Sequence, residues 1–258
     1  MAKQRKGPRV YDLSLPIENY ANEPFPPEIM YTTHVEGTRR LGKAYGLATQ
    51  DFPEGMALAS ENITLTPHTG THADAQWHFG PTCAGRRSRT IDEMPLEWFY
   101  GDGAVLDLHH KKAAESITAE DVREAEKKVK AKIGPGVIVL IRTDAYKKWE
   151  TPEYPNAHPG MSAEATAYLI KKGIRVMGID AYGFDRPFAA MAKDYKAGDK
   201  GALWPSHVLG RKMPYTHIEK LAYLDRLPRP FGFKVAAFPV KIARASAGWV
   251  RCVAIFER

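Results

Sequence analysis

The hydrophobic residues of the chain form short runs that alternate with longer amphipathic segments. Strand-like runs of hydrophobic residues predict strands at 104–108, 137–142, 175–179, 233–240 and 249–256. Apolar residues at helical spacing predict helices at 118–132, 162–172 and 217–224. Because helices alternate with strands through the middle of the chain, we expect an α/β or α+β layer fold.

The first two predicted helices carry clear signals at their ends. Thr118 is expected to cap the first helix, with Asp121 three residues later in a typical capping pattern. Ser162 is expected to cap the second helix, and Gly173 to end it. Stretches that mix Pro, Gly and aromatic residues predict long loops, which often carry function, at 18–27, 146–160 and 186–205.

Length and composition indicate one large globular domain with a sizeable core. Of 258 residues, 44% are hydrophobic and 26% charged, which is ordinary for a globular protein. We expect a single domain over residues 11–258 after a basic, flexible tail at residues 1–10. No apolar run is long enough to span a bilayer, and none follows the basic N-terminus as a secretory signal requires.

The net charge of +7 does not indicate nucleic-acid binding. Four of the basic residues behind it lie in the expected tail: Lys3, Arg5, Lys6 and Arg9. The remaining excess is small, so we expect neither nucleic acid nor a membrane as a partner. Cys83 and Cys252 lack CxxC spacing, which favours free thiols in a reducing compartment, and we expect the cytoplasm.

Four side chains that can bind metal occur within eleven residues: His68, His72, Asp74 and His78. In an extended strand His68 and His72 would lie roughly 13 Å apart, at ~3.3 Å per residue. One ion with bonds of ~2.0–2.2 Å could not reach both imidazoles. We therefore expect the backbone to curl at Gly70, where a left-handed conformation costs least, so that His68, His72 and Asp74 converge.

This set of side chains favours a catalytic metal site. Imidazoles with a carboxylate suit Zn²⁺, Mn²⁺ or Fe²⁺ better than Ca²⁺, and three protein ligands leave coordination positions open. Such a site lowers the pKa of bound water and polarises a carbonyl oxygen. His78 is not needed as a ligand and is placed to transfer protons. The HExxH, GxSxG, P-loop and GxGxxG motifs of other chemistries are absent.

The segment HTGTHADAQWH, residues 68–78, resembles the HxGTHxDxPxH signature of the cyclase-type metal-dependent hydrolases. That family includes bacterial kynurenine formamidase and isatin hydrolase. Four further segments resemble the family: YDLSLPI, GIRVMGIDAYGFD, SHVLGRKMPYTHIEKLAYLDRLP and FKVAAFPVKIARASAGWVRCVAI. The resemblance therefore covers nearly the whole chain after about residue 10. It implies a swivelling β/β/α-type domain with a mixed sheet, usually assembled as a dimer or larger oligomer.

The resemblance also implies roles for individual residues. His68, His72 and Asp74 match metal ligands, and His78 matches the catalytic acid/base. Two later residues match ligands of a second ion or the rest of the shell: His207 and Glu219. The sequence departs from the family pattern at three places, where Pro, Ser and Asn are replaced by Gln76, Gly183 and Tyr223.

Several other residues have weaker claims. His217 lies two residues before Glu219, but on the predicted helix the two would point in different directions, so we favour Glu219 alone. His158 lies in a predicted loop, and nothing in the sequence indicates a functional role for it. Asp180 ends a predicted strand, where it is equally suited to bind substrate or to hold the following loop. The candidates for substrate binding are Trp77, Phe79, Asp180 and Trp204.

The sequence thus predicts a metal-dependent hydrolase with one or two Zn²⁺ or Mn²⁺ ions. The expected reaction is arylformamidase-like cleavage of a C–N bond by metal-bound hydroxide. Expected substrates are a small amide, formamide, lactam or lactone, aromatic or carboxylate-bearing, and the expected assembly is a homodimer or homotetramer. The alternative is a metal- or ligand-binding scaffold that has lost hydrolase activity.

Overall fold

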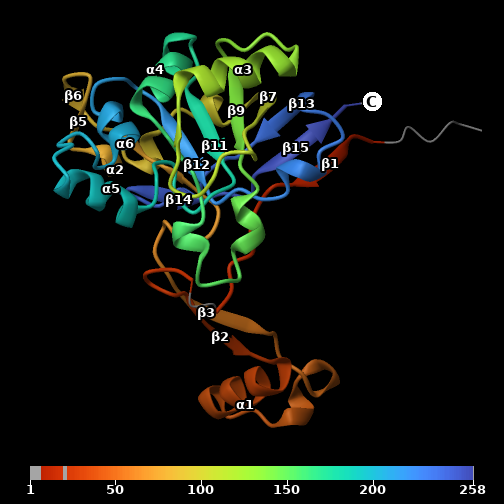
Figure 1. The fold of residues 1–258 in the computed structure, drawn as a ribbon. Helices are drawn as coiled ribbons and strands as arrows, with labels where there is room; N and C mark the ends of the chain where they lie inside the picture. Colours follow the sequence, from red (N-terminus) through yellow and green to blue (C-terminus); the bar gives the residue numbers. More distant parts are fainter. Residues whose placement is uncertain (1–6, 20–21, 258) are drawn as a thin grey trace, which may run out of the picture. The chain divides into compact units, whose positions relative to one another are not determined.

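The computed structural model describes residues 7–19 and 22–257 of the chain (Figure 1). It divides into two compact units: a main unit, Met1–Pro16 with Pro67–Arg258, and a small unit, Ile17–Thr66. Of the expected tail, residues 1–6 lie outside the described part, whereas Arg9 and Val10 belong to the first strand.

A nine-stranded mixed sheet forms the centre of the main unit. In spatial order its strands are β1 (Arg9–Asp12), β15 (Val253–Phe256), β13 (Phe231–Ala236), β7 (Tyr100–Asp107), β9 (Val137–Arg142), β11 (Val176–Ile179), β12 (Thr216–Glu219), β4 (His72–Asp74) and β14 (Ala247–Trp249). The four strands from β7 to β12 run parallel to one another, and the remaining pairs are antiparallel. The predicted α/β fold with a mixed sheet is confirmed.

Helices α3 (Ala119–Val129) and α4 (Ala163–Lys171) pack against one face of this sheet (Figure 1). As predicted, the Thr118 hydroxyl accepts a hydrogen bond from the Asp121 N–H, and the Ser162 hydroxyl caps α4. The opposite face carries a second core that includes Leu13, Phe99 and Leu221. Both faces of the central strands are therefore buried, which explains why residues 137–141 of β9 are all apolar.

The remaining elements of the main unit are short. Its other helices are α2 (Gln76–Phe79), α5 (Phe188–Lys196) and α6 (Pro205–Gly210). Its small strand pairs are β5 (Thr82–Cys83) with β6 (Arg86–Arg87) and β8 (Ser116–Ile117) with β10 (Gly160–Met161). Single 3₁₀ turns occur at Ile91–Glu93, Leu96–Phe99, Ala145–Lys148, Tyr154–Asn156 and Leu224–Arg226.

The small unit is an antiparallel ribbon with one helix. Strands β2 (Glu28–Thr32) and β3 (Ser60–Thr64) pair with each other, and α1 (His34–Tyr45) lies between them in the sequence. Two 3₁₀ turns follow α1, at Thr49–Asp51 and Pro53–Gly55. Because a two-stranded ribbon buries little apolar surface, several large side chains stay exposed, among them Leu58 at 84%.

Three sequence predictions are wrong in detail. The predicted helix 217–224 is strand β12 followed by a 3₁₀ turn, because pairing with β11 and β4 on both sides overrides local helix propensity. The predicted strand 249–256 is two strands, β14 and β15, that lie near opposite ends of the sheet. The predicted loop 186–205 contains α5, whose Met191 is buried.

Both cysteines are free, as their spacing predicts, and both are buried. Over the described residues, no helix combines the length and apolar character that crossing a bilayer requires.

Candidate metal centre

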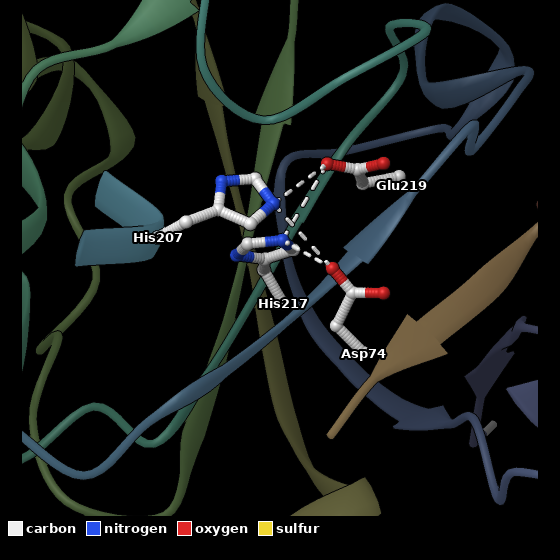
Figure 2. A group of neighbouring side chains, drawn as sticks. All are labelled: Asp74, His207, His217 and Glu219. Atoms are coloured by element: carbon white, nitrogen blue, oxygen red, sulfur yellow. Dashed lines mark hydrogen bonds and ion pairs between the residues drawn. The ribbon is translucent and has the colours of Figure 1, made fainter. Parts of the chain in front are cut away.

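The register between β4 and β12 builds the centre. These strands are antiparallel, and Glu219 lies opposite His72. Alternate residues of a strand share one face, so Asp74 joins His72 and His217 joins Glu219 on the same side of the sheet. Figure 2 shows Asp74, His217 and Glu219 turned toward one another, with His207 approaching from α6.

The carboxylate of Asp74 is the common neighbour of the imidazoles. Its Oδ2 lies 2.9 Å from His217 Nε2, 3.7 Å from His207 Nε2 and 3.8 Å from His78 Nε2. Its Oδ1 lies 3.0 Å from His68 Nδ1. Asp74 is 1% exposed, whereas the side chains of His68 and His78 are 29% and 35% exposed. The centre therefore has a buried side and a side open to solvent.

His72 completes the buried side. Its Nε2 lies 3.4 Å from Asp74 Oδ1 and 3.7 Å from Glu219 Oε2. The backbone turns at Gly70, where φ is 63°, and this turn brings His68 Nδ1 within 3.3 Å of His72 Nε2. The curl that the spacing predicts is therefore present.

Hydrogen bonds outside the centre fix the orientation of two histidines. His72 Nδ1 donates to the Gly70 carbonyl at 2.9 Å, and His207 Nδ1 donates to Asp185 Oδ2 at 2.6 Å. With the proton on Nδ1, each neutral ring presents the lone pair of Nε2 to the centre. This is the arrangement of metal-binding histidines, whose outer nitrogen is held by a carbonyl or carboxylate.

His217 is oriented in the same way. Its Nδ1 lies 3.3 Å from the hydroxyl oxygen of Tyr215, whose O–H donates to the Ser206 carbonyl. The Tyr215 oxygen therefore accepts from His217, and Nε2 faces Asp74 and Glu219. The ring also stacks on Phe184, with centroids 4.3 Å apart.

Burial and neighbouring charged groups shift the pKa values of the side chains in the centre. Burial opposes the charge of Asp74, but the imidazoles of His78, His207 and others outweigh burial and hold the pKa of Asp74 well below its ordinary value. Burial also opposes a charge on His207, yet hydrogen bonds to Asp185 and Asp74 raise its pKa to about 10. Burial dominates at His78 and lowers its pKa to about 4. Without an ion, His207 is therefore protonated near pH 7 and faces the carboxylates as a cation, whereas His78 is neutral.

The donor atoms fit a divalent cation. Two groups of donor atoms each lie within 4.8 Å: one from Asp74, His207, His217 and Glu219, the other from His68, Asp74 and His78. Asp74 Oδ1 is buried and accepts no hydrogen bond from the described residues. Mixed imidazole and carboxylate donors suit Zn²⁺ or Mn²⁺, and Asp74, which belongs to both groups, is placed to bridge two ions.

Comparison with known proteins agrees with this geometry. A model of the Cyclase family matches residues 11–186. The chain belongs to this family. The family that the sequence motifs indicate is therefore confirmed, and residues 68–78 lie inside the matched region.

Two kinds of relative resemble this Cyclase-family chain. The kynurenine formamidase of Bacillus cereus is 24% identical over 184 residues, which cover 67% of this chain and 69% of that protein. An isatin hydrolase bound to the product analogue thioisatinate superposes with a TM-score of 0.76 at 22% identity, covering 98% of this chain and 94% of that one. Isatin hydrolase A from Ralstonia solanacearum gives a TM-score of 0.73 at 22% identity, covering 97% and 92% of the two chains.

The structure brings together all the residues that the sequence nominates for metal binding and proton transfer, and it adds His217. The sequence favours Glu219 over His217 because a helix would point the two side chains in different directions. In strand β12, residues 217 and 219 are two apart and share a face, with Thr216 and Ile218 on the other. The alternation of ligand-type and β-branched residues was the signal that could have identified His217.

The four candidates for substrate binding lie in different surroundings. Trp77 and Trp204 are both substantially exposed, and Trp204 stacks on Phe188 with centroids 5.1 Å apart. Phe79 is instead buried in the core, where its ring contacts the imidazoles of His207 and His217 from behind. Phe79 therefore supports the centre rather than lining an open surface.

Asp180 is also fully buried. Its Oδ1 accepts hydrogen bonds from the Thr143 N–H and hydroxyl, and its Oδ2 accepts from the Asp144 N–H. The sequence allows Asp180 either to bind substrate or to hold a loop. These hydrogen bonds match the second role, because they hold the loop that follows β9.

Proposed function

We propose that this protein hydrolyses the C–N bond of a small aryl formamide or lactam. It is a metal-dependent hydrolase, and the observation that carries this conclusion is the convergence of imidazoles and carboxylates on Asp74. The proposed ligands are His68, His72, Asp74, His207 and Glu219, with His217 added by the structure.

A divalent ion held by these residues supplies acidity to a water molecule and polarisation to a carbonyl oxygen. Zn²⁺ and Mn²⁺ are the ions that we propose, in one or two copies. Asp185 holds His207 in position, and the Gly70 carbonyl does the same for His72. The buried side of the centre is therefore rigid before a substrate arrives.

His78 is the proposed acid/base. It belongs to the open side of the centre, and its Nε2 lies 3.8 Å from Asp74 Oδ2. From this position its imidazole can take a proton from water and deliver it to the leaving nitrogen. The exposed Trp77 and the stacked Trp204 and Phe188 offer flat apolar surfaces that suit an aromatic ring.

The names of the relatives support this substrate class. One group is named for a formamidase and the other for the hydrolysis of isatin, so both names refer to hydrolysis of small molecules. A lactone is the alternative substrate within the same chemistry, because its carbonyl is attacked in the same way.

Removal of the metal tests the proposal. Protein treated with a chelator should lose hydrolysis of formanilide, a lactam and a lactone, and should regain it with Zn²⁺ or Mn²⁺. Metal analysis of the untreated protein would give the identity and number of the ions. Hydrolysis that is indifferent to chelation would contradict the mechanism.

We also propose a cytoplasmic homodimer or homotetramer. The two free, buried cysteines suit a reducing compartment. The small unit exposes large apolar side chains, including Val35, Tyr45 and Leu58, and a second copy of the chain could cover them. Light scattering after size-exclusion chromatography would give the assembly, and Leu58→Glu should shift it toward monomer.

A further inference from the structure

His68 differs from the other proposed ligands in where it lies and in which nitrogen it presents. It belongs to a turn, whereas the others lie on β4, β12 and α6. Its Nδ1 lies 3.0 Å from Asp74 Oδ1, whereas His72, His207 and His217 face Asp74 with Nε2. Because no strand or helix fixes His68, other contacts must hold its ring for Nδ1 to reach a cation.

Ser246 contacts the outer nitrogen of this ring. Its Oγ lies 3.0 Å from His68 Nε2. Ser246 directly precedes β14, and its carbonyl accepts a hydrogen bond at 2.8 Å from the N–H of Ala75, the residue after β4. When Nδ1 gives its lone pair to a cation, the ring proton is on Nε2, and the Ser246 hydroxyl accepts it. Ser246 thus favours the tautomer and the ring orientation that a ligand at Nδ1 requires.

Lys220 contacts the backbone of the same residue. Its Nζ donates a hydrogen bond to the His68 carbonyl at 2.9 Å. Lys220 is 4% exposed, and Nζ lies 4.7 Å from the centroid of the Tyr182 ring. A lysine is rarely buried to this extent unless its charge is engaged, and hydrogen bonds from a charged donor are stronger than neutral ones. The buried ammonium therefore fixes the turn that carries His68.

The backbone of Lys220 is strained. It follows Glu219 at the end of β12, and its φ is 57°, in the left-handed region that favours glycine. Its N–H donates to the Ala181 carbonyl at 2.9 Å, and its carbonyl accepts from the Thr71 hydroxyl at 2.5 Å. Strain of this kind collects at functional sites, and here it places a lysine where glycine would be easier to accommodate.

We propose that Ser246 and Lys220 are positioning residues that hold His68, one by its ring and the other by its carbonyl, as a ligand on the open side of the centre. This inference rests on the metal centre of the proposed function and deepens it. Neither residue binds the ion. Each acts through His68.

Lys220 makes the proposal sharply testable because its two effects on cation binding have opposite signs. Its positive charge repels a cation, so the loss of this charge alone would strengthen metal binding. The loss of its hydrogen bond to the His68 carbonyl would release the turn and weaken metal binding. The proposal requires that the second effect is the larger one.

The experiment titrates the chelated protein with Co²⁺ and follows the visible absorption of the bound ion. Ser246→Ala and Lys220→Gly should each weaken Co²⁺ binding about 10–100-fold, as for other partners of metal-binding histidines. Glycine suits the positive φ, so Lys220→Gly removes the ammonium without straining the backbone. Ser246→Thr keeps the hydroxyl and should restore binding. Lys234→Met removes a charge from the exposed pair of Lys234 with Asp102 and should have no effect.

A double-mutant cycle shows whether the two residues act through His68. His68→Ala should bind Co²⁺ more weakly but measurably, because the other proposed ligands remain. In this background Ser246→Ala and Lys220→Gly should cause no further loss, since the ring that they position is gone. Equal losses in both backgrounds, or tighter Co²⁺ binding by Lys220→Gly, would overturn the proposal. Urea unfolding of each metal-free variant confirms that folded proteins are compared.

Formanilide hydrolysis by the wild type, measured separately, keeps this inference distinct from the proposed function. Wild-type protein that binds Co²⁺ but hydrolyses no formamide, lactam or lactone would contradict the proposed function, while the cycle would still decide the roles of Ser246 and Lys220. Wild-type protein that binds no Co²⁺ would overturn both.

Discussion

Asp74 and Asp180 are both buried carboxylates beside strands of the same sheet, yet their surroundings differ. Asp74 is 1% exposed and Asp180 is 0% exposed. Imidazoles surround Asp74 and hold its pKa well below the ordinary value. Around Asp180, burial outweighs the donors of Thr143 and Asp144 and raises its pKa to about 7. Burial alone therefore does not identify a metal ligand.

The hydrogen bonds of the two carboxylates show the same contrast. Both oxygens of Asp180 accept hydrogen bonds from Thr143 or Asp144. Asp74 Oδ1 accepts none from the described residues, although two imidazole nitrogens lie within 3.4 Å of it. A carboxylate whose partners are backbone donors holds a loop in place. One whose partners are imidazoles with inward lone pairs is suited to a cation.

The largest effect is expected when the negative charge of Asp74 is removed. Because Asp74 belongs to both ligand groups, the Asp74→Asn variant should lose bound metal. Its kcat/KM should fall by about 10³-fold or more, because several kcal/mol of charge stabilisation is lost and each 1.4 kcal/mol corresponds to a tenfold change in rate. Metal analysis and formanilide hydrolysis measure both effects. Asp107→Asn, the same change in the exposed pair of Asp107 with His109, is the control and should leave both unchanged.

Replacing His78 separates catalysis from metal binding. His78→Ala should keep the ion of the buried donor group, because His207, His217 and Glu219 remain, while kcat falls by about 10²–10⁴-fold through loss of general acid/base catalysis. His110→Ala is a control outside the centre. If turnover were absent in the wild type as well as the variant, the protein would be the non-catalytic scaffold that the sequence also allows.

The next prediction concerns the positioning of His207. Asp185→Asn removes the charged acceptor of His207 Nδ1, and such partners of metal-binding histidines typically contribute 10–100-fold to affinity or activity, so we expect about that loss of metal affinity. Metal titration of the chelated protein measures it. Asp194→Asn disrupts only the ion pair with Arg186 and serves as the control. Equal affinities of Asp185→Asn and wild type would show that the Asp185 contact is dispensable.

Much of this centre was predictable from the sequence, because several of its residues lie close together in the chain. The spacing of His68, His72 and Asp74 demands a curl, and Gly70 supplies it. The strand 137–142 and the cap at Thr118 also follow from local pattern.

The rest depends on contacts between segments far apart in the chain. His217 became a candidate ligand only through the pairing of β12 with β4, which converts an expected helix into a strand.

Asp180→Asn should have the smallest effect on activity, within about twofold, and its effect should appear in stability instead. Because the folded pKa of Asp180 is raised to about 7, the folded protein keeps a proton that the unfolded chain loses above its ordinary pKa of 3.8. The contribution to stability is therefore fully present below about pH 4 and is lost as pH rises through about 7, by at most about 1.4 kcal/mol per pH unit.

Asn lacks this proton, so the difference in unfolding free energy between wild type and Asp180→Asn isolates the titration of Asp180 from that of the imidazoles. Urea unfolding of both metal-free proteins at several pH values should show the wild type losing stability relative to the variant between about pH 4 and 7. A difference that stays constant, or changes in the opposite direction, would mean that the Thr143 and Asp144 donors outweigh burial. Asp180 would then be ionised like Asp74, and only the nature of the partners, not the charge state, would distinguish the two carboxylates.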